Sequence, residues 1–189
     1  LTPAGKQMLV LRAGLAQDGK ENIFRESFQK PGFIDAVADM LQEFKRYMVA
    51  PETLLKQAER CESALLKQKL QALAAIYETY LDLARGQFLD SEEDLPSLAA
   101  YIETTDIFSG TGFWFDEFSD FLPQHYLLLR ALVKKAQSVH VALALPENAD
   151  AEVYQVPLAT LGRLRRCCGA GELRETAVAG AYRHIASEE

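Results

Sequence analysis

The chain has 189 residues, of which 49% are hydrophobic and 25% are charged, and its formal net charge is −7. This length suits one domain or two small ones, and the composition supports a packed core and argues against disorder. The acidic balance argues against a free-standing nucleic-acid-binding domain, whose affinity would come from clustered lysines and arginines, but it does not exclude one segment of a larger DNA-handling protein.

The cysteines and the hydropathy pattern indicate the cellular setting. Three cysteines occur, Cys61 and the adjacent pair Cys167 and Cys168, and none has zinc-site spacing to a histidine. An odd count without a disulfide framework indicates reduced thiols in a cytoplasmic protein. No apolar run approaches the roughly 20 residues of a membrane span. The start of the chain, Leu1-Thr2-Pro3-Ala4-Gly5, has no Met and no signal-peptide layout, so we expect a piece of a longer cytoplasmic protein that has no membrane contact.

The first part of the chain shows helical periodicity with clear start and stop signals. Pro31-Gly32 is expected to break the chain, and Pro51-Glu52 is expected to begin a short helix. The apolar spacing predicts helices over residues 3–16, 23–29, 33–48, 58–84 and 92–103.

Several side chains in these helices allow more than one interpretation. Met8, Leu9 and Leu15 are expected on the apolar face of the first helix. Tyr77 and Tyr80 could stack on nucleic-acid bases, although aromatic residues at helical spacing are more often part of a core.

The last part of the chain alternates between strand and helix patterns. Strands are predicted at residues 113–116 and 139–145, and a weak third strand at 173–178. Helices are predicted at 123–137 and 157–168, the latter with Leu158, Leu161 and Leu164 inward. Such alternation is typical of a parallel sheet with crossover helices, so the prediction is an α/β fold with a helical region at residues 1–110 and an α/β region at 111–189.

The acidic pair Asp116-Glu117 directly follows the first predicted strand. Ligands of open α/β sheets bind beyond the carboxyl ends of the strands. Two carboxylates there can hold a hydrated Mg²⁺ and orient a water for phosphoryl transfer. The alternative is a solvated acidic loop without chemistry.

The run Phe115-Asp116-Glu117-Phe118-Ser119-Asp120-Phe121-Leu122-Pro123-Gln124 resembles motif II, the Walker B box, of UvrD-like superfamily 1 helicases. Within these, the chain is most similar to the AddB (RexB)-type subunit of the AddAB helicase–nuclease. This similarity extends over roughly residues 5–178. The segments that carry it are Pro31-Gly32-Phe33-Ile34, Glu43-Phe44-Lys45-Arg46-Tyr47 and Pro51-Glu52-Thr53-Leu54, together with Phe118 and Phe121.

The resemblance implies a fold and a function. The fold would be part of a RecA-like parallel-sheet helicase domain with a large all-helical inserted subdomain. The AddAB-type complex would process DNA double-strand ends for recombinational repair. In it, an AddA-like partner would be the ATP-driven motor, and the AddB-like subunit would be a helicase-like subunit that scans DNA. ATP and Mg²⁺ are the implied cofactors of the full-length parent.

The resemblance also assigns roles to residues. Asp116 would hold Mg²⁺ and contribute to nucleotide binding, Glu117 would orient or deprotonate the attacking water, and Gln124 would contact the cofactor. AddB-like subunits often carry Asp-Gly at motif II, whereas the Asp-Glu here is intact. No Gly-x-x-x-x-Gly-Lys-Ser/Thr loop occurs, so residues 1–189 alone are not expected to hydrolyse ATP or to hold a bound cofactor. Two alternatives remain, an active UvrD-type DNA helicase and an unrelated helical interaction domain.

Overall fold

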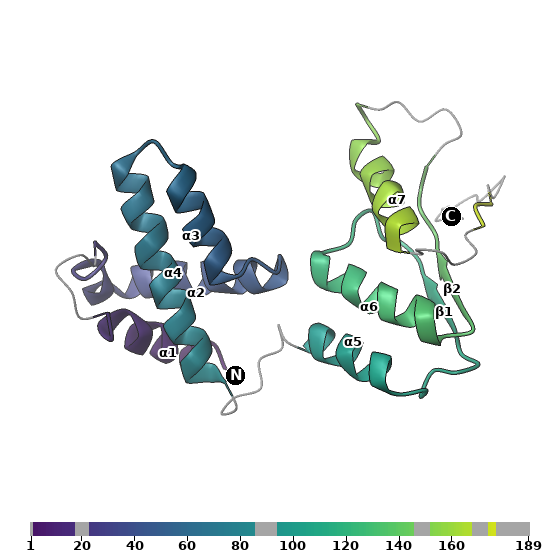
Figure 1. The fold of residues 1–189 in the computed structure, drawn as a ribbon, viewed down its shortest axis with the longest axis horizontal. Coiled ribbons are helices and arrows are strands. Elements are labelled where there is room, and N and C mark those ends of the chain that lie inside the picture. Colours follow the sequence, from purple (N-terminus) through teal and green to yellow (C-terminus); the bar gives the residue numbers. More distant parts are fainter. Residues whose placement is uncertain (1, 18–22, 86–93, 146–151, 168–173, 177–189) are drawn as a thin grey trace, which may run out of the picture.

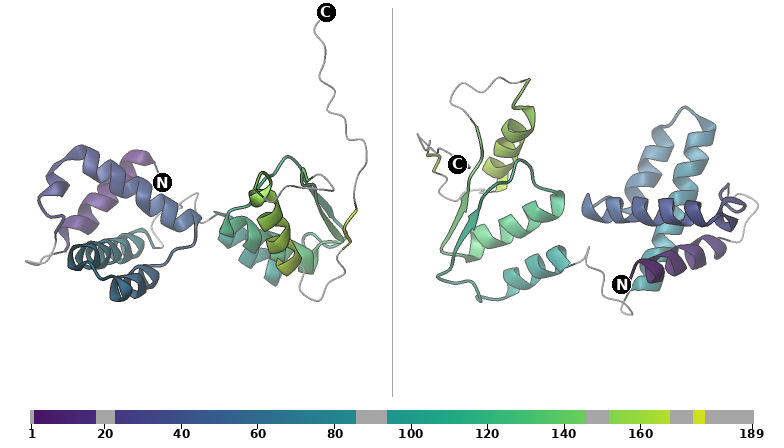
Figure 2. Two further views of the ribbon diagram at one scale, coloured as in Figure 1. Left: turned by 90° about the horizontal axis from the view of Figure 1, so that it is seen from above. Right: turned by 180° about the vertical axis from the view of Figure 1, so that it is seen from behind.

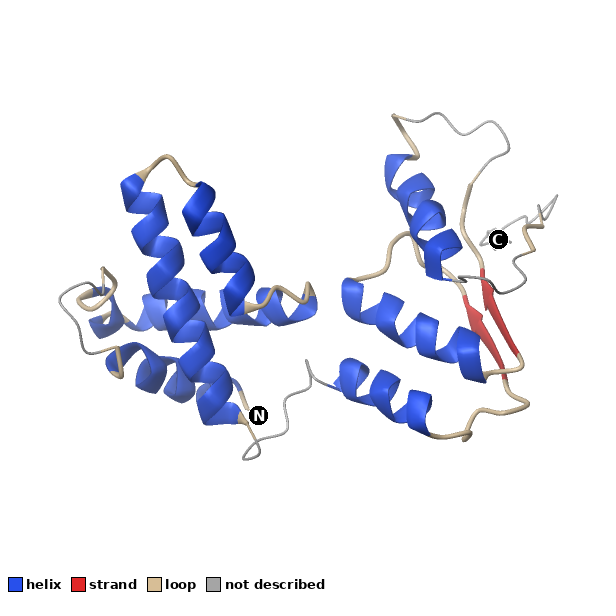
Figure 3. Cartoon of the chain, in the orientation of Figure 1, coloured by secondary structure: helices blue, strands red, loops and turns tan. Residues whose placement is uncertain are grey.

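A computed structural model describes residues 2–17, 23–85, 94–145, 152–167 and 174–176. These residues form mostly helices and one small sheet (Figures 1 and 3). The elements in chain order are α1 (Pro3–Leu15), η1 (Ser27–Gln29), α2 (Pro31–Arg46), α3 (Pro51–Arg60), α4 (Ala64–Ala84), α5 (Asp94–Thr104), β1 (Gly112–Phe115), α6 (Pro123–Lys135), β2 (Ser138–Val141) and α7 (Gln155–Cys167).

Proline and short polar side chains determine where several helices begin. Pro3, Pro31 and Pro51 each occupy the start of a helix, where the missing N–H has no helical partner to lose. Ser63 is the N-cap residue of α4, because its Oγ accepts the backbone N–H of Leu66 at 3.4 Å. The expected chain break at Pro31-Gly32 is therefore wrong, since these two residues form the first turn of α2.

Helices α1 to α4 share one hydrophobic core. Its buried side chains come from all four helices and from η1: Leu9, Val10, Ala13, Phe28, Val37, Leu41, Leu54, Leu73, Ala74, Ile76, Tyr77, Tyr80 and Ala84. Tyr77 and Tyr80 are each only 3% exposed, so they serve the core and cannot stack on bases.

Two expectations about these helices are corrected. The helix predicted over residues 58–84 is interrupted, because α3 ends at Arg60 and α4 begins at Ala64. Met8 and Leu15 are 66% and 60% exposed, whereas Leu9 and Val10 are buried. The buried stripe of α1 is therefore rotated from the one expected, because α1 is packed by α2 and α4 on the side of Leu9, Val10 and Ala13.

Strands β1 and β2 form a two-stranded parallel sheet in which Phe113 pairs with Val139 and Phe115 with Val141. Helix α6 connects them and packs against β2 and α5. The α5 and α6 side chains Ala99, Ile102, Ala131 and Leu132 form a second core, against which Phe113, Phe115 and Val139 pack.

The described strands are shorter than expected. β2 ends at Val141, not at residue 145, because its partner β1 ends at Phe115, whose carbonyl accepts the last ladder bond from the N–H of Ala142 at 2.8 Å. Residues 174–176 are not in a strand, and the rest of the predicted third strand lies outside the described residues. The α/β prediction is thus confirmed only as a mostly helical chain with a small parallel sheet.

Helix α7 packs against α6, and the side chain that it buries was not expected. Thr160 is fully buried, whereas Leu158 is 37% exposed. The inward position predicted for Leu158 is therefore wrong. Among the described residues, no helix is both long and apolar enough to span a membrane.

Candidate functional site

The acidic pair lies at the carboxyl end of β1, as the sequence predicts. Asp116 and Glu117 directly follow the last residue of the strand, and both are exposed. The Oδ1 atom of Asp116 accepts the backbone N–H of Glu117 at 2.8 Å. Glu117 has φ = 63°, which lies in the left-handed region that residues other than glycine rarely adopt. The backbone thus turns sharply at the pair, which ends the strand and leaves both carboxylates accessible to a hydrated cation.

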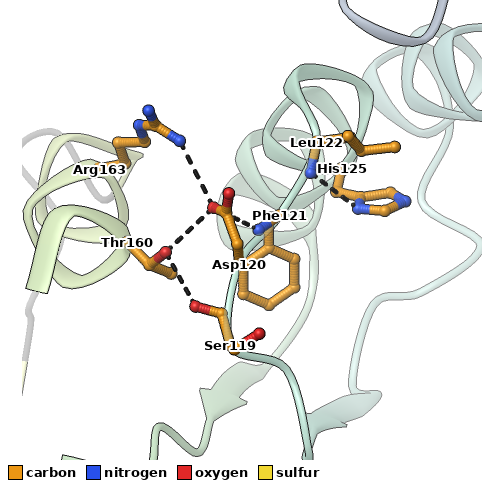
Figure 4. A network of polar contacts seen from close by, with 7 residues as sticks. All are labelled: Ser119, Asp120, Phe121, Leu122, His125, Thr160 and Arg163. Carbon is orange, nitrogen blue, oxygen red and sulfur yellow. Dashed lines mark hydrogen bonds and ion pairs between the residues drawn. The ribbon is translucent and has the colours of Figure 1, made fainter. Parts of the chain in front are cut away.

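A polar network attaches the following residues to α7 (Figure 4). The hydroxyl of Thr160 lies 3.1 Å from the backbone oxygen of Ser119 and 3.0 Å from Oδ1 of Asp120. The same Asp120 oxygen accepts the backbone N–H of Phe121 at 2.7 Å, and Nη1 of Arg163 lies 3.4 Å from it. Asp120 therefore anchors the acidic loop, here defined as residues 116–122, to α7.

His125 closes the other end of the acidic loop. Its Nδ1 accepts the backbone N–H of Leu122 at 3.1 Å, which satisfies a donor at the start of α6 (Figure 4). Burial lowers the pKa of His125, because the partly enclosed site disfavours the charged ring. A neutral imidazole is also the form that can accept this hydrogen bond.

Aromatic rings pack within and below the acidic loop. Phe118 and Phe121 are stacked with their centroids 4.8 Å apart, and Phe121 is also in edge contact with Phe115 and Tyr126. Phe121 is only 3% exposed, whereas Phe118 is 40% exposed. The loop therefore has a hydrophobic attachment through Phe121 besides its polar one through Asp120.

Gln124 does not bond to the acidic pair but to the end of helix α2. Its side-chain nitrogen donates to the backbone oxygen of Lys45 at 2.9 Å, and the residue is 4% exposed. Lys45 is in the last turn of α2, and its ammonium lies 5.8 Å from the ring centroid of Tyr80 in α4. Gln124 thus connects the start of α6 to the four-helix region.

The structure brings together some of the predicted site residues but not all of them. Asp116 and Glu117 are adjacent on the exposed loop, whereas the amide nitrogen of Gln124 is occupied by the Lys45 carbonyl. Within the described ranges, no group of three or more His, Cys, Asp or Glu side chains is arranged to hold a metal ion. The two carboxylates fit one or two ligand positions of a hydrated Mg²⁺, and other ligands would have to come from water or phosphate.

Sequence patterns did not identify the groups that hold the loop. Thr160 lies 40 residues beyond Asp120, and a single threonine on a helix has no distinguishing pattern. The position of His125 could have indicated its role. It lies three residues after Leu122 at the start of a helix, where a side chain can bond back to the backbone of the residue that precedes the helix.

Comparison with known proteins identifies the family. A sequence profile described as "ADDB, N-terminal" matches residues 1–188. The B-type subunit of the ATP-dependent helicase/deoxyribonuclease of Clostridium tetani is 38% identical over 146 residues, which cover 76% of this chain and 13% of that protein. The equivalent protein of Thermoanaerobacter sp. strain X514 is 31% identical over 170 residues, which cover 87% of this chain and 15% of that protein.

A third relative, the equivalent protein of Clostridium botulinum strain Hall, is 33% identical over 145 residues, covering 76% of this chain and 12% of that protein. The chain thus spans between 12% and 15% of the length of these relatives. The profile covers nearly the whole chain, which excludes an unrelated helical interaction domain, and the chain belongs to the AddB N-terminal family.

Proposed function

We propose that this chain is part of an AddB-type subunit that processes DNA double-strand ends together with an AddA-like partner. Within that complex, its role is helicase-like binding and scanning of DNA, while the partner supplies the ATP-driven motor. The observation that carries the proposal is the family match over residues 1–188, together with relatives that are named as B-type subunits of an ATP-dependent helicase/deoxyribonuclease.

The proposal includes a larger fold around the described residues. The β1–β2 pair and its crossover helix α6 would be part of a RecA-like parallel sheet, and α1 to α4 would form the inserted helical subdomain. The division was predicted near residue 110. The packing of α5 against α6 favours a division before Asp94, because the α5 side chains Ala99 and Ile102 belong to the core beneath the sheet.

A role in DNA-end processing is tested with linear DNA as the substrate. The full-length parent and its partner are purified separately and mixed with linear or closed circular duplex DNA, in the presence of ATP. We expect ATP-dependent degradation or unwinding of the linear DNA by the complex, and none by the parent alone. Equal activity of the partner alone would contradict a role for the parent in DNA-end processing.

A second candidate is a subunit that is itself an ATP-driven helicase, and the intact Asp116-Glu117 pair at the end of β1 favours it. Bound ATP with Mg²⁺ would supply the phosphoryl group and the energy of its transfer. Asp116 would bind the cation, through water because Mg²⁺ loses its hydration shell reluctantly, and Glu117 would orient or deprotonate the attacking water.

Gln124 would take part only after a rearrangement in this second candidate. Gln124 is 4% exposed and its amide nitrogen donates to the Lys45 carbonyl at 2.9 Å, so a cofactor contact requires this side chain to become accessible. The phosphate cradle would have to come from outside residues 1–189, since these contain no Gly-x-x-x-x-Gly-Lys-Ser/Thr loop. The two candidates therefore differ in what Glu117→Gln does to ATP hydrolysis.

A further inference from the structure

The described elements group into two regions, each with its own hydrophobic core. We call α1 to α4 with η1 the four-helix region, and α5 to α7 with β1 and β2 the sheet region. Among the described residues, the two cores have no side chain in common. The chain passes from one region to the other once along these elements, between Ala84 and Asp94. Two bodies of this kind are expected to move relative to each other, unless a large hydrophobic interface joins them.

A polar contact joins the two regions in the arrangement seen here. Gln124, in the first turn of α6, donates from its side-chain nitrogen to the carbonyl of Lys45, in the last turn of α2, at 2.9 Å. Figure 2 shows the end of α2 facing the start of α6, as Figure 1 does from the other side. Gln124 is 4% exposed, so the contact is shielded from water while the regions stay together.

Each end of this hydrogen bond is held firmly within its own region. Lys45 is 9% exposed, and its ammonium lies 5.8 Å from the ring centroid of Tyr80 in α4. On the other side, Gln124 closely follows Phe121, which is 3% exposed. Breaking the bond therefore separates two packed bodies and leaves the structure of each one intact.

The end of α2 is built so that the bond can break at little cost. The Lys45 carbonyl also accepts the N–H of Met48 at 3.0 Å, and the Phe44 carbonyl accepts that of Val49 at 2.7 Å. Met48 has φ = 55°, so this turn is a Schellman ending, which satisfies the last carbonyls within the helix itself. The Lys45 carbonyl thus keeps a partner when Gln124 leaves, and water reaches the amide as the regions separate. Such a bond shifts the equilibrium between joined and separated regions by about two- to tenfold.

We propose that the Gln124–Lys45 hydrogen bond is a releasable latch, and that the four-helix region turns as one body relative to the sheet region when the latch opens. The latch lies in the turn of α6 that directly follows the acidic loop, so this motion acts next to that loop. The proposal goes beyond the role in DNA-end processing, and it does not depend on whether Asp116 and Glu117 support ATP hydrolysis.

Distances between the two regions of the full-length parent test the latch. Amber codons at Glu59 in α3 and Ala100 in α5, both exposed, introduce p-acetylphenylalanine, which takes nitroxide labels without reaction of the native cysteines. Double electron–electron resonance then gives the distribution of distances between the labels. We expect a main distance and a minor second one in the native protein. In Gln124→Ala, the population of the second distance should rise by about two- to tenfold.

Three controls separate release of the latch from other effects. Gln17→Ala removes an amide that lies 2.8 Å from the Thr79 hydroxyl inside the four-helix region, so the distances between the regions should stay as in the native protein. Gln124→Asn keeps a carboxamide on a shorter side chain and should behave like Gln124→Ala. Labels at Met8 and Glu59, both in the four-helix region, should keep one narrow distance in every variant.

Three results would overturn the proposal. The same inter-region distances in the native protein and in both Gln124 variants would mean that other contacts fix the regions. An equal rise of the second distance in Gln17→Ala would mean a general loosening that has nothing to do with the latch. A broadened Met8–Glu59 distance in both Gln124 variants would mean that the four-helix region loses its structure and does not turn as one body.

Discussion

The attachment of the acidic loop to α7 can be tested by removing one hydroxyl group. Thr160→Val keeps the shape of the side chain but removes the donor that lies 3.1 Å from the Ser119 oxygen and 3.0 Å from Oδ1 of Asp120. Thr160 is completely buried, so water cannot replace the lost group at that position without movement of α7.

The magnitude follows from what each acceptor keeps. An acceptor left unsatisfied in a buried site costs about 1–3 kcal/mol. Asp120 keeps the N–H of Phe121 and the guanidinium of Arg163, and its side chain is 46% exposed, so water can hydrate it. We therefore expect the lower half of that range, about 1–2 kcal/mol of lost stability.

Urea unfolding of residues 1–189 measures this loss. With an m-value of about 2 kcal/mol per molar urea, the midpoint should fall by about 0.5–1 M. Thr104→Val is the matched control, because its hydroxyl donates to the Tyr101 oxygen at 2.9 Å on an exposed surface, where water can substitute. That control should change stability by no more than about 0.5 kcal/mol.

Two results would refute the role given to Thr160. The first is an equal effect of Thr160→Val and Thr104→Val on the urea midpoint. The second is additivity of Thr160→Val and Asp120→Asn in a double-mutant cycle, because residues in direct contact should couple by at least about 0.5 kcal/mol.

Two further predictions concern the start of α6. Burial lowers the pKa of His125 below 6.5, so the folded protein binds fewer protons than the unfolded protein. The contribution of His125 to the free energy of unfolding is therefore fully present above pH 6.5 and is lost as the pH drops toward the lowered pKa. His125→Gln should remove this pH dependence from urea midpoints measured between pH 7.5 and pH 5. Gln124→Ala should cost about 1 kcal/mol, because the Lys45 carbonyl keeps the N–H of Met48. Gln124→Glu at pH 7.5 should cost more, since a carboxylate oxygen would then face that carbonyl; an equal or smaller loss would contradict the Gln124–Lys45 bond.

Local signals in the sequence predicted most helices and the position of the acidic pair. Pro3, Pro51 and the apolar spacing of α4 from Leu73 to Ala84 gave helices close to those observed. The strand before Asp116 was also expected, and β1 ends at Phe115. These features depend on residues that are near one another in the chain.

Features that depend on distant residues were missed or wrongly placed. Two helices were expected here, but the boundary between them was placed near residue 58, whereas α3 ends at Arg60 and α4 begins at Ala64, directly after Ser63, a typical N-cap residue. The end of β2 depends on where β1 ends, and the burial of Thr160 depends on Ser119 and Asp120. The roles of Asp116, Glu117 and Gln124 toward a cofactor stay predictions.

Steady-state ATP hydrolysis, with single-stranded DNA present, tests most directly whether the parent protein scans DNA or drives the motor. The full-length parent is assayed alone and with its partner, as the native protein, as Glu117→Gln and as Glu59→Gln, a matched change at an exposed position of α3. We predict that hydrolysis requires the partner and that neither substitution changes it. Hydrolysis by the parent alone that is lost in Glu117→Gln and kept in Glu59→Gln would contradict this account and would identify Asp116 and Glu117 as a working motor site.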